Sequence, residues 1–185
     1  DGSATSADID YAAVVAGSLT VPAGSLSGTI SITINGDTKF ETDETLTVTL
    51  SNPVNSSLGT VLATGTISND DGVPALSIGS MAQPEGNAGT SSFGFTVTLS
   101  QVSGVNVTVQ FDTADGTASV GASDYPAVVA GSLTIPAGSP SGTIPILVNG
   151  DTLYEGNETF IVNLSNPVNA TITASQGTGT IINDD

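Results

Sequence analysis

The chain of 185 residues contains 18 acidic residues and one basic residue, Lys39, so its formal net charge at pH 7 is −17. This balance excludes nucleic acid, whose phosphates need lysine and arginine. It also disfavours an anionic membrane surface, and no run is long and apolar enough for direct membrane insertion. Because cysteine and histidine are both absent, disulfides, the usual zinc and copper sites and Ser-His-Asp catalysis are excluded too, which leaves oxygen chemistry with a cation as the expected partner.

The first part of the chain, residues 1–71, is repeated at its end. DYAAVVAGSLTVPAGSLSGTI from Asp10 corresponds to DYPAVVAGSLTIPAGSPSGTI from Asp124, an offset of 114 residues. At this offset residues 1–71 align without a gap onto residues 115–185, and nothing in front of Asp1 corresponds to residues 72–114. A fixed repeat period indicates an array of similar domains. The sequence therefore predicts a complete domain at residues 72–185, preceded by a truncated copy at residues 1–71 that keeps the C-terminal part only.

Short runs of alternating apolar and polar residues predict seven strands in the complete copy. Phe93, Phe95 and Val97, for example, fall on one face of a strand because successive side chains point to opposite sides. Seven short strands separated by turn segments such as PEGNAG and PAGSPSG predict an all-β fold, an immunoglobulin-like seven-stranded antiparallel β-sandwich. The truncated copy retains about the last four strands. In chain order the predicted strands are residues 75–78, 92–99, 105–111, 132–135, 143–148, 159–164 and 178–182.

Acidic residues recur in the loops and at the strand ends of both copies. Two carboxylates about 6 Å apart repel by roughly 3 kcal/mol at an effective dielectric of about 20, so a group of them without basic neighbours favours a bound divalent cation. Clustered oxygen ligands suit Ca²⁺ better than Mg²⁺, which keeps more of its water. Seven acidic positions have the same residue type in both copies: Asp1/Asp115, Asp10/Asp124, Asp37/Asp151, Glu41/Glu155, Glu44/Glu158, Asp70/Asp184 and Asp71/Asp185.

A series of motifs in this order resembles one known family. EGN, DGTASVGASDY, LTIPAGSPSGTI, NGDTLYEGNETFIVNLSNP and GTIINDD are similar to the successive motifs of Calx-beta domains. The resemblance covers nearly all of residues 72–185 and, from DGSATSADIDY onward, all of the first copy. It implies a seven-stranded sandwich of the kind found in sodium/calcium exchangers, an integrin β subunit and large bacterial surface proteins, several of which bind Ca²⁺ at the end that carries the C-terminus.

The resemblance also implies a set of metal ligands. Where the most acidic members of the family have a third consecutive aspartate, this chain has Asn69 and Asn183, which implies one or two Ca²⁺ ions per copy. Asp1 and Asp115 precede glycines and are expected to form turns instead. The family's acidic ligands fall on Glu85, Asp124, Asp151, Glu155, Glu158, Asp184 and Asp185 in the complete copy, and on Asp10, Asp37, Glu41, Glu44, Asp70 and Asp71 in the truncated copy.

The main functional hypothesis is a Ca²⁺-binding tandem β-sandwich module of a large extracellular or cell-surface protein. Asp70 and Asp71 stand directly before the second copy, so a bound ion is expected to rigidify the inter-domain junction for cell adhesion or scaffolding. The expected partners are calcium ions, neighbouring repeats of the same array and identical chains.

Two other functions are compatible with the sequence. In one, the chain is a structural filament or spacer repeat that assembles by β-strand complementation between chains, with Ca²⁺ incidental. In the other, it is a regulatory Ca²⁺ sensor. The paired carboxylates Glu155 and Glu158 are of the type used in glycoside hydrolysis, but a loop repeated in each copy does not make a substrate cleft, so the chain is not expected to be an enzyme.

Overall fold

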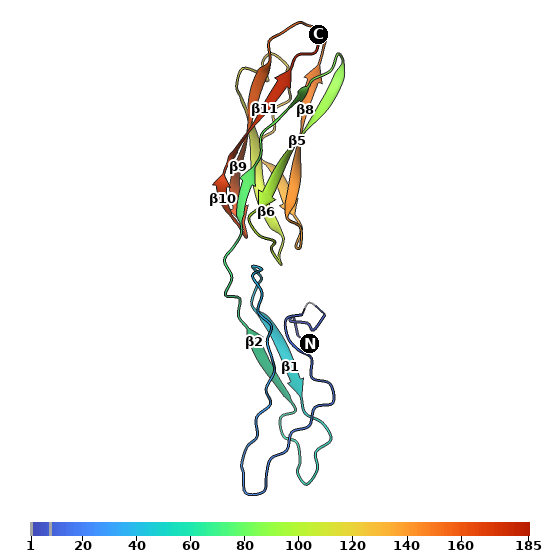
Figure 1. Cartoon of the computed structure of the whole chain (residues 1–185), viewed down its shortest axis with the longest axis vertical. Coiled ribbons are helices and arrows are strands. Elements are labelled where there is room, and N and C mark those ends of the chain that lie inside the picture. The colour runs from blue at the N-terminus through green and yellow to red at the C-terminus, as the bar shows by residue number, and fades with distance from the viewer. Residues whose placement is uncertain (1, 8) are drawn as a thin grey trace. The chain divides into compact units, whose positions relative to one another are not determined.

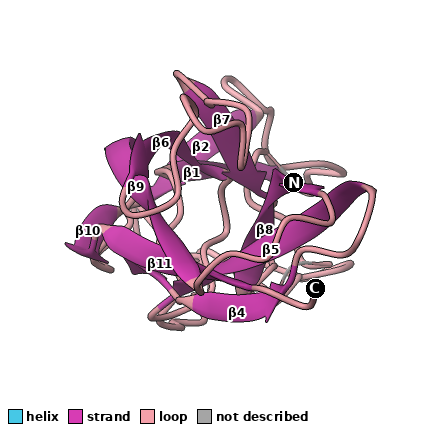
Figure 2. Cartoon of the chain, turned by 90° about the horizontal axis from the view of Figure 1, so that it is seen from above, coloured by secondary structure: helices cyan, strands magenta, loops and turns pink. Residues whose placement is uncertain are grey.

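The computed structural model describes residues 2–7 and 9–185, which form two compact units, unit 1 (Asp1–Asp71) and unit 2 (Gly72–Asp185) (Figure 1). The described residues contain strands, turns and loops, without a helix (Figure 2). Consequently, the described part of the chain has no helix of the length and hydropathy needed to span a membrane. The predicted all-β class is confirmed.

Unit 2 is a sandwich of two β-sheets. The first has the order β10-β3-β5-β8, with β10 at Thr171–Ala174, β3 at Ala75–Ile78, β5 at Gly89–Leu99 and β8 at Ser141–Gly150. The second has the order β4-β11-β9-β6-β7, with β4 at Met81–Pro84, β11 at Gln176–Ile182, β9 at Glu158–Val168, β6 at Val107–Asp115 and β7 at Gly131–Ile135. Neighbouring strands are antiparallel except in the pairs β10–β3 and β11–β4, which are parallel.

The core of unit 2 lies between the two sheets and follows from the alternation in the sequence. Phe93, Phe95 and Val97 of β5 are fully buried, while the residues between them are exposed. Phe160 of β9 packs against them from the other sheet, with ring centroids 5.9 Å from Phe93 and 5.7 Å from Phe95. Tyr125, 1% exposed, stacks on the same ring at 4.8 Å. A single aromatic cluster therefore joins the sheets.

Unit 2, all of which is described, has nine strands where the sequence predicted seven antiparallel ones. The additional strands, β4 and β10, arise because the first and last strands each divide between the two sheets. The chain changes sheet between β3 and β4 at Gly79, and between β10 and β11 at Ser175. A Cβ on Gly177 would lie 2.7 Å from the carbonyl oxygen of Gly79, so glycine is needed where these segments pass each other.

The described part of unit 1 contains two antiparallel strands, β1 (Glu44–Thr49) and β2 (Leu62–Ile67), where the sequence predicted about four. Residues 17–21 and 27–36, which correspond to β7 and β8, form no strand beyond a bridge from Ile34 to Tyr11. In unit 2 these strands pair with β6 and β5, which have no counterpart in unit 1. Without a hydrogen-bonding partner, an alternating sequence is not held as a strand.

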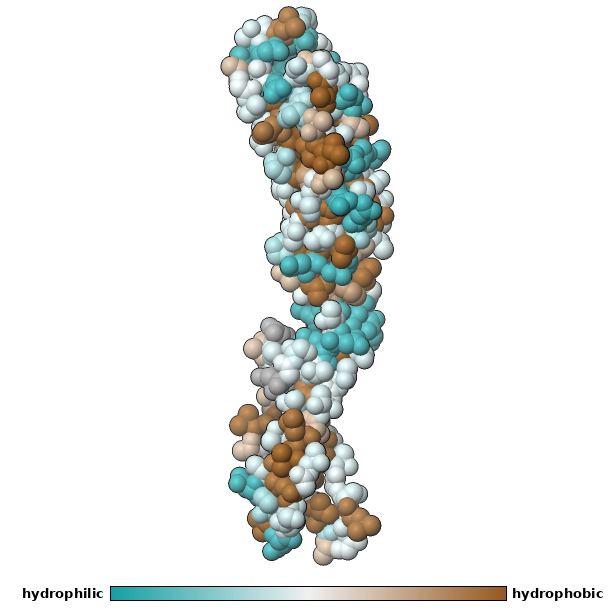
Figure 3. Space-filling model, turned by 180° about the vertical axis from the view of Figure 1, so that it is seen from behind, coloured by the Kyte–Doolittle hydropathy of each residue, from teal (hydrophilic) through white to brown (hydrophobic). Residues whose placement is uncertain are grey.

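The same difference leaves apolar residues of unit 1 exposed, and Figure 3 shows apolar side chains on its surface. Ile30 and Ile34 are 40% and 45% exposed, whereas their counterparts Ile144 and Val148 are fully buried. The buried hydrophobic residues described in unit 1 are Ala4, Tyr11 and Leu46. The two units therefore share a sequence pattern, but the apolar side chains of that pattern are less buried in unit 1 than in unit 2.

Candidate metal centre

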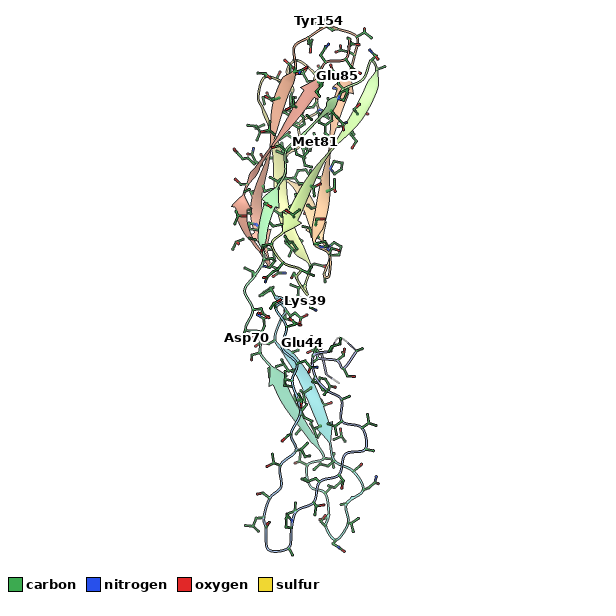
Figure 4. All side chains as sticks on the ribbon, in the orientation of Figure 1. Lys39, Glu44, Asp70, Met81, Glu85 and Tyr154 are labelled. Atoms are coloured by element: carbon green, nitrogen blue, oxygen red, sulfur yellow. The ribbon has the colours of Figure 1, made fainter. Side chains whose placement is uncertain are left out.

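The topology of unit 2 brings several acidic loops to one end of the sandwich. β4 and β11 run in parallel and end together, with Pro84 opposite Ile182, so Glu85 and the terminal Asp184–Asp185 segment emerge side by side. β9 begins at Glu158, which pairs with Ile181 of β11. Figure 4 places Glu85 and Tyr154, from the loop before β9, at the end of unit 2 that also carries the C-terminus. Residues distant in sequence thus converge.

Three carboxylates form the closest group in unit 2, here called the unit-2 carboxylate group: Asp124, Glu155 and Glu158. Each offers one oxygen, and these oxygens lie within 4.8 Å of one another. Asp124 is fixed by its own loop, because the Ser119 N–H donates to Asp124 Oδ2 at 2.7 Å. The Glu155 N–H donates to Asn183 Oδ1 at 2.9 Å, which ties the second loop to the chain end. The group is therefore held by backbone contacts rather than by opposite charge.

The surroundings of this group favour neutralisation of its charge. Burial, the charge of Asp124 and a hydrogen bond to Asp124 raise the pKa of Glu158 to about 7. Glu85 is 7% exposed, and burial followed by the charges of Asp151, Glu155 and the two terminal aspartates raises its pKa as well. Since unit 2 has no lysine or arginine, the negative charge of these carboxylates can be neutralised only by bound protons or by a bound cation.

The other predicted ligands of unit 2 lie outside the closest group and are bonded to loop atoms. Asp151 Oδ1 accepts the Leu153 N–H at 2.7 Å. Asp184 Oδ1 accepts the Gly86 N–H at 3.0 Å, and Asp185 Oδ1 accepts a hydrogen bond from Asn87. Asp184 thereby holds the loop that contains Glu85. The charges of these aspartates act on Glu85, and their hydrogen bonds shape the loops.

Unit 1 repeats this arrangement with its own group, the unit-1 carboxylate group: Asp10, Glu41 and Glu44, again with oxygens within 4.8 Å of one another. They line a pocket of about 280 Å³. Figure 4 shows Lys39, Glu44 and Asp70 at one end of the unit. The pocket brings together all six acidic residues predicted for this copy: Asp10, Asp37, Glu41, Glu44, Asp70 and Asp71.

The loop hydrogen bonds are also repeated. The Thr5 N–H donates to Asp10 Oδ2 at 2.7 Å, and the Glu41 N–H donates to Asn69 Oδ1 at 2.9 Å. Asn69 Nδ2 donates in turn to the carbonyl oxygen of Asp71 at 2.8 Å. Asn69 and its counterpart Asn183 thus organise the last residues of their units. The two sites have the same local framework.

Comparison with known protein families identifies the family to which these two units belong. The family model described as the Calx-beta domain matches residues 1–71 and 82–185. The chain belongs to the Calx-beta domain family. This confirms the resemblance seen in the motifs. Comparison with curated protein sequences gives no match.

Solved structures of Calx-beta domains are similar to this chain. The apo-form Calx CBD1 domain is 26% identical, with a TM-score of 0.53, and the similarity covers 61% of this chain and 99% of that one. CBD12 from CALX1.2 is also 26% identical, with a TM-score of 0.53 over 60% of this chain and 44% of that one. The calcium binding domain CBD12 of CALX1.1 is 26% identical, with a TM-score of 0.52, and the similarity covers 60% of this chain and 46% of that one. This chain therefore matches less than half of the two CBD12 structures.

Asp115 of the second Calx-beta unit lies apart from the carboxylate group and bonds within its own loop. Tyr125 donates its hydroxyl hydrogen to Asp115 Oδ1 at 2.6 Å, and the Val120 N–H donates to the same oxygen at 3.1 Å. These hydrogen bonds lower the pKa of Asp115. Its counterpart Asp1 lies outside the described residues. Asp115 thus anchors a core tyrosine, a role that the Asp-Gly turn pattern did not predict.

One basic side chain lies in the Calx-beta site of unit 1. Lys39 Nζ donates to Glu41 Oε1 at 2.8 Å, and Lys39 also lines the pocket. The hydrogen bond to Glu41, followed by nearby carboxylate charge, raises the pKa of Lys39 against the opposing effect of burial. At the equivalent position unit 2 has Leu153. At this position of the repeat, unit 1 therefore carries a positive charge and unit 2 carries none.

Proposed function

We propose that the chain is a Ca²⁺-binding tandem module, with one site in each unit. The observation that supports it is the recurrence of a three-carboxylate group with the same loop framework in both units: Asp10, Glu41 and Glu44 in unit 1, and Asp124, Glu155 and Glu158 in unit 2. In each, the oxygens are close enough to share one ion, and their mutual repulsion favours an ion over an empty site.

The donor set suits calcium among the common metal ions. Carboxylate and carbonyl oxygens are hard ligands, and Ca²⁺ accepts six to eight of them in flexible arrangements. The sequence has no histidine or cysteine for zinc or copper. A related structure is described as a calcium binding domain, which supports the same choice. Residues bordering the carboxylate groups, such as Asp37 and Asp151, are available as further ligands.

We further propose that the ion in unit 1 stiffens the link to unit 2. Asp70 and Asp71 line the unit-1 pocket and are the last residues before Gly72, where unit 2 begins. An ion bound in that pocket would restrict the backbone of these two residues. The role is structural rather than enzymatic, in adhesion or scaffolding by a large extracellular or cell-surface protein, where millimolar Ca²⁺ suits the weak affinity typical of extracellular modules.

The test is a calorimetric Ca²⁺ titration of the full chain, paired with melting curves with and without chelator. We expect saturable binding and a higher melting temperature with Ca²⁺. Asp10→Asn combined with Asp124→Asn should weaken both effects. Asp112→Asn is the control: Asp112 Oδ1 accepts a hydrogen bond from Asn163 Nδ2 at 3.1 Å, away from the carboxylate groups, and asparagine keeps an acceptor there. No binding up to several millimolar Ca²⁺ would reject the proposal.

The exposed apolar residues of unit 1 favour a second candidate, a filament or spacer repeat completed by strands from another chain. Sedimentation in chelator distinguishes the candidates. Concentration-dependent assembly without Ca²⁺ would support the filament, and a monomer whose hydrodynamic behaviour responds to Ca²⁺ would support the first proposal.

A further inference from the structure

Lys39, in the loop before β1, contacts the unit-1 carboxylate group, and the loop before β9 has an uncharged residue at the equivalent position. Lys39 is the one basic residue of the whole sequence, and its ammonium contacts Glu41, a member of the unit-1 carboxylate group, at 2.8 Å. At the same place in unit 2 the side chain is that of Leu153, which is 61% exposed and uncharged. A cationic group of the protein thus lies against one candidate calcium site and not against the other.

The backbone at this position is the same in both units, so the difference resides in the side chain. The Lys39 N–H donates to Asp37 Oδ1 at 2.7 Å, and the Leu153 N–H donates to Asp151 Oδ1 at 2.7 Å. Two residues further on, each glutamate N–H donates to an asparagine Oδ1 at 2.9 Å. Exchanging the two side chains therefore alters charge near the site while leaving the loop hydrogen bonds in place.

We infer that Lys39 is a built-in competitor for Ca²⁺ in unit 1, so that the two units bind the ion with unequal affinity. This inference rests on the proposed Ca²⁺ function and adds a regulatory element to it. The ammonium is bonded to one carboxylate oxygen of Glu41, a proposed ligand, and it repels a divalent cation. It also balances part of the acidic charge when Ca²⁺ is absent, so unit 1 depends less than unit 2 on the ion for neutralisation.

The expected size of the effect follows from Coulomb's law. A doubly charged ion and an ammonium about 6 Å apart in a water-like dielectric of about 80 repel enough to change a dissociation constant about tenfold. The side chains of Lys39 and Glu41 are 39% and 27% exposed, so a high dielectric is the appropriate choice. The effect should shrink at high ionic strength, because salt screens exposed charges.

The experiment measures each unit separately within the full chain by calorimetric Ca²⁺ titration. Unit 1 is read in a background that carries Asp124→Asn and Glu158→Gln, and unit 2 in a background with Asp10→Asn and Glu44→Gln. In the first background Lys39→Leu should tighten Ca²⁺ binding about tenfold, and Lys39→Met, which keeps the length of the side chain, should do the same. In the second, Leu153→Lys should weaken binding about tenfold.

A matched control separates this local contact from the general charge of the loop. Asp43 Oδ1 accepts the Asn69 N–H at 3.0 Å, and Asn157 Oδ1 accepts the Asn183 N–H at 3.2 Å in unit 2. Asp43→Asn therefore removes one charge from the same loop and keeps its hydrogen bond. It should change the unit-1 dissociation constant by less than about threefold, since Asp43 is outside the pocket.

The outcomes distinguish this inference from the function on which it rests. An unchanged unit-1 affinity in both Lys39→Leu and Lys39→Met, with unit 2 still binding Ca²⁺, would overturn the competitor role and leave the proposed function intact. An effect of Asp43→Asn as large as that of Lys39→Leu, but opposite in sign, would assign the difference to overall loop charge and overturn it as well. Absence of saturable binding in both units would overturn both proposals.

Discussion

The carboxylates of Glu158 and Asp124 each bring one oxygen within 4.8 Å of the other, in a unit that has no lysine or arginine to balance their charge. The pKa of Glu158 is accordingly raised from 4.5 to about 7, first by burial and then by the charge of Asp124. At neutral pH the site is thus poised between holding a proton and holding a cation. Several measurable properties follow from this pair.

The stability of the Ca²⁺-free chain should fall as the pH rises from about 5 to about 8. Folded unit 2 binds a proton at Glu158 more tightly than the unfolded chain does, so the free energy of unfolding decreases between the ordinary pKa of 4.5 and the folded value of about 7. Burial raises the pKa of Glu85 in the same direction. Melting curves in Ca²⁺-free buffer across this range test the slope. Saturating Ca²⁺ should flatten it, and a rising stability without Ca²⁺ would contradict the prediction.

Glu158→Gln should separate stability from ion binding. The amide is neutral, so it removes repulsion from Asp124, and the melting temperature without Ca²⁺ at pH 7.5 should rise. The response of unit 2 to Ca²⁺ should disappear, which costs about 1.4 kcal/mol of stabilisation at free Ca²⁺ tenfold above its dissociation constant. Differential scanning calorimetry with and without Ca²⁺ measures both. Asp112→Asn, which changes the net charge equally, should leave the Ca²⁺ response intact.

Tyr125→Phe should destabilise unit 2 by about 1 kcal/mol, because it removes the hydrogen bond from a buried ring to Asp115 while preserving the stack on Phe160. Denaturant unfolding measures the change. The matched control is Tyr154→Phe, since Tyr154 is 81% exposed and its change should fall within about 0.5 kcal/mol of zero. Equal effects of the two substitutions would show that the Asp115 contact contributes nothing.

Gly150→Ala should destabilise unit 2 by about 1–3 kcal/mol, the usual cost of overpacking, and weaken its Ca²⁺ binding. A Cβ on Gly150 would overlap the carbonyl oxygen of Gly86 and approach that of Glu85, so the loop with Glu85 would have to move. The repeat supplies the control. Gly36 occupies the equivalent position in unit 1 with no atom within 4 Å of such a Cβ, and Gly36→Ala should be nearly neutral. Chemical denaturation and Ca²⁺ titration of both variants test the contrast.

The sequence predicted the strands of unit 2 better than the points at which the first and last strands pass from one sheet to the other. Alternation in β5 and β8 is visible because one face of each is buried against the other sheet. The breaks between β3 and β4 and between β10 and β11 leave no mark on that alternation, since they depend on where two distant segments cross. In unit 1 the repeat predicted a strand at residues 29–34, the counterpart of residues 143–148. It does not form, because the strand that would pair with it has no counterpart there.

The candidate site was predictable in composition but not in geometry. Recurrence at the repeat offset and the family resemblance selected acidic residues that the structure gathers at one end of each unit. The sequence could not indicate that Asp124, Glu155 and Glu158 form the closest group, while Asp151 accepts a hydrogen bond from the Leu153 N–H. Nor did it predict the position of Lys39 beside Glu41, because loop closure rather than periodicity sets that contact.

The parallel pairing of terminal strands in unit 2 has a mechanical consequence. Force entering at Gly72 and leaving at Asp185 would pull β3 and β4 in one direction and β10 and β11 in the other, along the axes of the paired strands. Hydrogen bonds loaded in this shearing geometry share the load and break together, whereas a hairpin pulled from its open end would unzip one bond at a time. Unit 2 is therefore built to withstand tension transmitted along the chain.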